Sequence, residues 1–66
     1  MRTVRLALSD PLLPEGPVVK LTGTKATLRG RDENTAEVVT FTVDWASYVQ
    51  MQFALEADGE IVVELP

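Results

Sequence analysis

Apolar and polar residues alternate along several short stretches of this chain, which is the pattern of β-strands. In residues 2–8, for example, the alternate positions are Val4, Leu6 and Leu8. Gly, Pro, Asn and Asp separate these stretches at short intervals, as in all-β domains. The pattern predicts strands over residues 2–8, 17–22, 24–30, 35–43, 49–56 and 60–65.

Residues 44–57 fit two patterns. A helix would begin after Asp44, a good N-cap residue, and would end before Gly59. Its apolar stripe would consist of Trp45, Tyr48, Val49 and Phe53. Two polar residues, Gln52 and Glu56, fall in the middle of that stripe, which speaks against a buried helix face.

The strand pattern fits the same segment without interruption, because every second residue from Val49 to Leu55 is a large apolar one. We therefore predict a strand over Val49–Glu56 and at most a single helical turn over 44–48. A three-residue loop, 57–59, would join this strand to the last one and pair Leu55 with Ile61. Gly59 would adopt the left-handed conformation in that loop.

The 66 residues allow one domain, residues 1–66, and the strand count predicts its class. We expect an all-β fold, a five- or six-stranded antiparallel barrel or folded meander of the size of an SH3-like barrel. There is no cysteine for a disulfide. Met1 is followed by no signal peptide, and no apolar run is long enough for a membrane span, so we expect a cytoplasmic protein without membrane contact.

The residue types for catalysis and metal binding are scarce. Without His or Cys, the usual general base, the best nucleophile and the best zinc ligands are missing. Asp32 and Glu33 are adjacent in a turn, where neighbouring side chains diverge. Glu60 and Glu64 are interpreted as an acidic strand face that discourages edge pairing rather than as cation ligands. We expect no enzyme activity, no catalytic residue, no cofactor and no metal.

Charge is divided unevenly along the chain. Residues 1–31 hold six basic and two acidic residues, a net +4, and residues 32–66 hold eight acidic residues and no basic one, a net −8. The simpler interpretation is that basic and acidic strands pair within one sheet. The alternative is a nucleic-acid surface, formed by the stripe Lys20, Lys25, Arg29 and Arg31. All four aromatic residues lie in the acidic half, away from that stripe.

Exposed apolar residues are the remaining candidates for a binding surface. The predicted partner-binding residues are Leu12, Leu13, Trp45, Tyr48 and Val62. The two leucines either cover an end of the fold or form the tip of a proline-rich loop, and the two aromatic residues either plug the barrel or anchor a partner. Val62, like Val38, lies on a strand face that should point outward.

These observations favour a non-enzymatic protein–protein interaction module that self-associates. Such a chain would serve as a small structural or assembly subunit, or as an inhibitor or immunity-type accessory protein. Its partner would be another protein or a second copy of the chain, held by the complementary charges of its two halves. The alternative is a small nucleic-acid-binding β-barrel.

Overall fold

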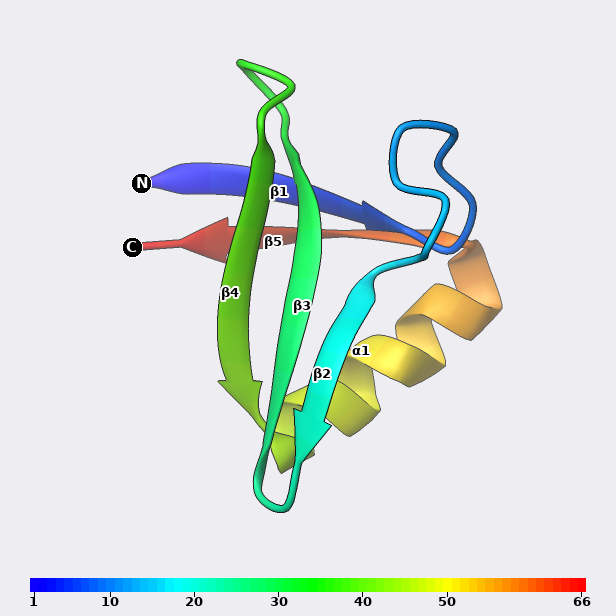
Figure 1. The fold of residues 1–66 in the computed structure, drawn as a ribbon, viewed down its shortest axis with the longest axis vertical. Helices are drawn as coiled ribbons and strands as arrows, with labels where there is room; N and C mark the ends of the chain where they lie inside the picture. The colour runs from blue at the N-terminus through cyan, green and yellow to red at the C-terminus, as the bar shows by residue number, and fades with distance from the viewer.

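In the computed structural model, residues 1–66 form five β-strands and one α-helix (Figure 1). The elements in chain order are β1 (Arg2–Ala7), β2 (Val18–Thr22), β3 (Lys25–Asp32), β4 (Val38–Asp44), α1 (Trp45–Asp58) and β5 (Glu60–Leu65).

All five strands belong to one antiparallel sheet, with β3 as its central strand. β4 pairs with β3 from Lys25 to Arg31, while β2 and β1 share the opposite edge of β3. β5 pairs antiparallel with β1, so the two termini lie side by side (Figure 1). This two-stranded ribbon crosses β3 and β4 steeply. β2, β4 and β5 each have one partner strand only. The predicted folded meander therefore fits, and the sheet is not closed into a barrel.

Gly30 allows β1 to cross β3. A Cβ atom at this position would lie 2.5 Å from the backbone oxygen of Arg5 and 2.7 Å from Cγ1 of Val4. The crossing is short, since only Val4 and Arg5 pair with β3, and one further backbone bond runs from Glu33 N–H to Thr3 O. Only a residue without a side chain fits between strands this close.

The prediction of a strand over Val49–Glu56 is wrong, because this segment is the middle of the 14-residue helix α1. Asp44 caps the helix by accepting a hydrogen bond from the Ser47 N–H at 2.8 Å, and left-handed Gly59 ends it by donating to Leu55 O. These capping interactions satisfy backbone groups that both helix ends leave unpaired.

The buried face of α1 differs from the stripe considered in the sequence. Leu55 is fully buried, and Tyr48 and Met51 pack against the core. The spacing 48, 51, 55 is a helical one. The predicted hairpin is consequently wrong as well: Ile61 lies opposite Leu6 of β1, not Leu55. The left-handed conformation of Gly59 is confirmed, but in a helix C-cap.

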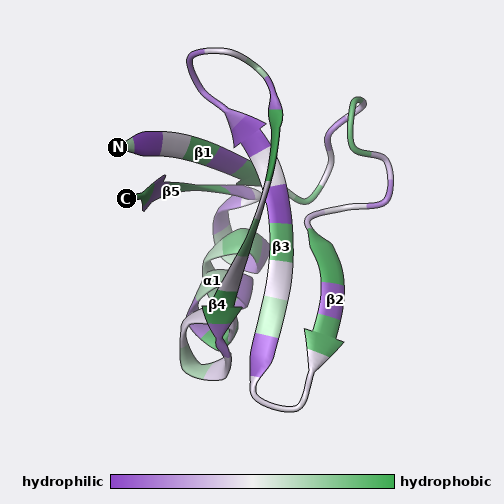
Figure 2. Ribbon diagram, turned by 60° about the vertical axis from the view of Figure 1, so that its left-hand side comes forward, coloured by the Kyte–Doolittle hydropathy of each residue, from purple (hydrophilic) through white to green (hydrophobic).

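Strand β3 extends further than predicted, through Asp32, and the loop to β4 spans 33–37. Hydrophobic and hydrophilic bands alternate along β3 in Figure 2. Its buried residues face α1, which covers one side of the sheet over β3, β4 and β5. The core cluster contains Val4, Leu6, Leu28, Val39 and Leu55. Such a small core leaves many large apolar side chains partly exposed.

Candidate functional site

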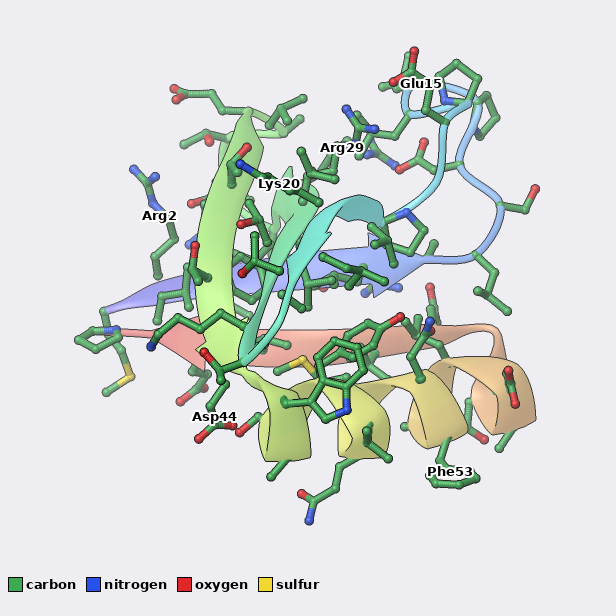
Figure 3. The ribbon with its side chains drawn as sticks, turned by 60° about the horizontal axis from the view of Figure 1, so that its bottom comes forward. Arg2, Glu15, Lys20, Arg29, Asp44 and Phe53 are labelled. Carbon is green, nitrogen blue, oxygen red and sulfur yellow. The ribbon has the colours of Figure 1, made fainter.

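One flank of α1 presents an exposed apolar stripe. Trp45, Val49 and Phe53 follow one another at four-residue spacing, with 43%, 37% and 69% of their surfaces exposed. Figure 3 shows Phe53 projecting from α1 away from the sheet. We call these three residues the helix flank. Contiguous rows of exposed apolar side chains, unlike single exposed residues, often mark interaction sites.

The first residue of the helix flank is held firmly in place. The backbone N–H of Trp45 donates to Thr24 O at 3.0 Å, and its ring lies 5.1 Å from that of Tyr48 at an angle of 52°. The Tyr48 hydroxyl accepts a hydrogen bond from Gln52 Nε2 at 2.8 Å. Tyr48 thus packs towards the core, while the indole it supports stays partly exposed.

Strand β2 carries a further apolar residue on the side of the sheet that α1 covers. Leu21 is paired with buried Ala26, so both side chains point to that side, yet Leu21 is about half exposed. The turn that follows β2 contains Thr24, the residue bonded to Trp45. The structure therefore leaves apolar surface on β2 as well as on the helix flank.

The basic stripe is largely engaged within the chain. Arg31 Nε donates to Asp10 Oδ2 at 2.7 Å, and Arg29 bonds Glu15 at 3.1 Å and Gly16 O at 3.0 Å. Figure 3 shows Arg29 beside Glu15. The two arginines therefore fasten the proline-rich loop, residues 8–17, to β3.

Two members of the stripe remain outside ion pairs, Lys20 and Lys25. Both are exposed. Phosphate contacts by the alternative nucleic-acid surface would thus rely on two lysines.

The proline-rich loop is ordered by Asp10. Its carboxylate accepts a hydrogen bond from the Leu12 N–H at 2.9 Å and bonds Arg31; chiefly the Leu12 bond holds the pKa of Asp10 below its usual value. Leu12 is 66% exposed at the surface of the loop, and Leu13 is half-buried. Of these two predicted partner-binding residues, only Leu12 is available as an apolar tip.

Basic residues of the first half of the chain also form ion pairs with acidic residues of the second half. Arg5 of β1 bonds both carboxylate oxygens of Glu60 on β5 at 2.9 Å and binds Glu33 at 2.7–2.8 Å. These bonds, first that to Glu33, raise the pKa of Arg5. Arg2 lies 3.2 Å from Asp32. Arg5 of the first strand is therefore paired with Glu60 of the last strand within one chain.

The five predicted partner-binding residues do not form one site. Leu12 and Leu13 lie on the loop, Trp45 and Tyr48 on α1, and Val62 on the sheet face opposite α1. Val62 is 53% exposed and pairs with Arg5, whose other neighbour in the sheet is Arg31.

Sequence reasoning missed Val49 and Phe53 as candidate site residues, because it placed them on the apolar face of a strand. The signal for them was present, because the helical stripe containing both was identified and set aside on account of Gln52 and Glu56. Polar residues within an apolar stripe exclude a buried face, but they are compatible with a solvent-exposed flank.

No three His, Cys, Asp or Glu side chains are grouped so as to hold a metal ion. A hollow lined by Arg5, Arg31, Asp32 and Glu33 is polar, and each of these side chains is in an ion pair. The one helix, at 14 residues, is too short to cross a bilayer.

No protein-family model, curated protein or solved structure matches the chain.

Proposed function

We propose that the chain is a non-enzymatic protein–protein interaction module that self-associates through the helix flank. The observation that supports this most directly is the exposed row of Trp45, Val49 and Phe53 on an otherwise well-formed helix. Aromatic side chains of this kind contribute a large share of the energy at protein interfaces.

The spacing of the row suits a second copy of the same chain. In a two-fold arrangement the same patch faces itself. If two α1 helices pack antiparallel with the axis at Val49, Trp45 of one copy lies opposite Phe53 of the other, and the reverse contact follows. Each aromatic residue is four residues from the axis, about 6 Å at the helical rise. The partners are therefore matched in position and chemistry.

The contact is driven by apolar burial rather than by charge. Arg5 and Arg29 form their ion pairs within the chain. These two arginines are therefore engaged already and contribute little to a charge-driven pairing of two copies. The three residues of the helix flank are uncharged, although Glu56 lies beside Val49 and Phe53 on the same side of α1. Because apolar side chains make the contact, its affinity should change little with salt.

The size of the row limits the affinity. From the surface of aromatic and branched side chains, the helix flank offers about 300 Å² per copy. A standard interface buries about 800 Å² per partner. We therefore expect a reversible dimer that dissociates on dilution, with a dissociation constant of about 10–100 µM.

Sedimentation of the chain across a concentration series tests the proposal. We expect the mean mass to rise from monomer towards dimer, at both low and high salt. Phe53→Ser should keep the monomer mass throughout. Leu12→Ser is the matched control, since Leu12 is equally exposed but lies on the loop. A wild-type monomer at millimolar concentration, or an equal effect of both substitutions, would contradict the proposal.

A further inference from the structure

The outer edge of β5 has unpaired backbone groups. Leu8 N–H donates to Gly59 O at 3.0 Å, and the register with β1 is unbroken from Gly59 to Leu65. In an antiparallel pair, hydrogen-bonded and non-hydrogen-bonded positions alternate. The even-numbered residues Glu60, Val62 and Glu64 therefore direct their N–H and C=O groups away from β1, to the edge of the sheet where no strand lies.

A groove runs beside this edge, between β5 and the flank of α1 opposite to Phe53. It has a volume of about 460 Å³, within the range of about 300–1,000 Å³ of ligand sites. Apolar parts of its lining come from Met51 and Ala54 on the helix and from Ile61 and Val63 on the strand. Side chains of an added strand that pointed towards α1 would enter an apolar environment.

Charge selects the kind of strand that fits. Glu60 and Glu64 flank Val62 on the edge strand, Glu64 is in no ion pair, and no basic residue follows Arg31 in the sequence. If two copies of β5 paired so that all three outward residues were used, Glu60 of one would lie opposite Glu64 of the other. Like charges placed directly opposite destabilise a sheet.

We propose that the edge of β5 binds an extended segment of another protein in which Lys or Arg alternates with apolar residues. The backbone of that segment would pair with Glu60, Val62 and Glu64, as in other cases of strand addition. Its basic side chains would face the two glutamates, and its apolar side chains would enter the groove. This site lies on the other flank of α1 from the self-association surface, so either can fail without the other.

The probe is a nine-residue peptide of alternating Lys and Val with blocked termini, compared with the same peptide in which Glu replaces Lys. Binding is followed by amide NMR shifts and hydrogen exchange of the full chain. We expect saturable binding of the Lys peptide only, with slowed exchange of the Val62 and Glu64 amides. Glu64→Lys should weaken binding about fivefold or more, because an attractive pair becomes a repulsive one.

Val62→Pro removes one outward N–H group and should abolish binding. Thr40→Pro is the matched control on β4: the Asp32 N–H to Glu37 O bond and the register place the N–H of Thr40 at the free edge of that strand. Thermal unfolding shows whether either variant is still folded, and Glu64→Lys provides a surface change independent of proline. Unprotected Val62 and Glu64 amides at saturating peptide, or equal binding of the Glu peptide, would overturn the proposal.

Discussion

Substitution of Gly30 by alanine tests the strand crossing on which the sheet depends. The new methyl group would lie 2.5 Å from Arg5 O and 2.7 Å from Val4 Cγ1, and the backbone oxygen belongs to a strand paired on both sides. Overpacking of this kind costs about 1–3 kcal/mol, and a clash with backbone belongs at the upper end, about 2–3 kcal/mol. For 66 residues, the free energy of unfolding is about 3–10 kcal/mol, so the loss is a large fraction of it.

The assay is thermal unfolding followed by circular dichroism. Since each kcal/mol shifts the melting temperature of a small domain by about 4–8 °C, Gly30→Ala should lower it by roughly 10–20 °C. Gly23→Ala is the control, because a Cβ atom at Gly23 meets nothing within 4 Å and its φ is not positive. It should leave stability unchanged or raise it slightly. A Gly30→Ala protein that melts with the wild type would refute the close crossing of β1 and β3.

Other changes test the helix and the carboxylates. Leu55→Ala removes the fully buried side chain of α1 and should cost about 2–5 kcal/mol in urea unfolding, and a cost below about 1 kcal/mol would contradict its place in the core. Asp44→Ala should lower the melting temperature by a few degrees while Asp44→Asn does not, since asparagine also caps helices. Hydrogen bonds from backbone N–H groups, first those of Leu12, Asn34 and Ser47, lower the pKa values of Asp10, Asp32 and Asp44 respectively. These carboxylates stabilise the folded state fully above the unfolded-state pKa of about 3.9, and this stabilisation is lost as the pH falls through their lower folded-state pKa values. The urea midpoint of unfolding should therefore drop between about pH 5 and pH 2. A midpoint that rises over this range would contradict the reasoning.

The strands were predictable where one face is buried and the other is in water. Alternation identified β1 and placed Val4 and Leu6 on one face, which the structure buries, and the turn residues located most strand ends to within a few residues. The pairing of β1 with β5 did not follow from alternation, because pairing depends on a connection through α1 that the sequence interpretation lacked.

The helix was missed because two periodicities overlap in the same residues. From Val49 to Leu55 every second residue is apolar, which imitates a strand, while 48, 51 and 55 form the helical face that is buried. The capping residues favour the helix. Asp44 and Gly59 bond backbone groups that the helix ends leave unpaired, whereas a strand has no such ends to cap. The same error hid the candidate site, since Phe53 was assigned to the apolar face of a strand and is the most exposed residue of the helix flank.

A nuclear Overhauser contact between the rings of Trp45 and Phe53 tests the central claim most directly. Within one helix these residues are eight positions apart, about 12 Å along the axis, too far for such a contact. In the two-fold pair centred on Val49 they lie opposite each other. We predict that a sample mixed from labelled and unlabelled chains, at a concentration where dimer is present, shows this contact between copies. Its absence in a sample shown by sedimentation to be dimeric would contradict self-association through the helix flank.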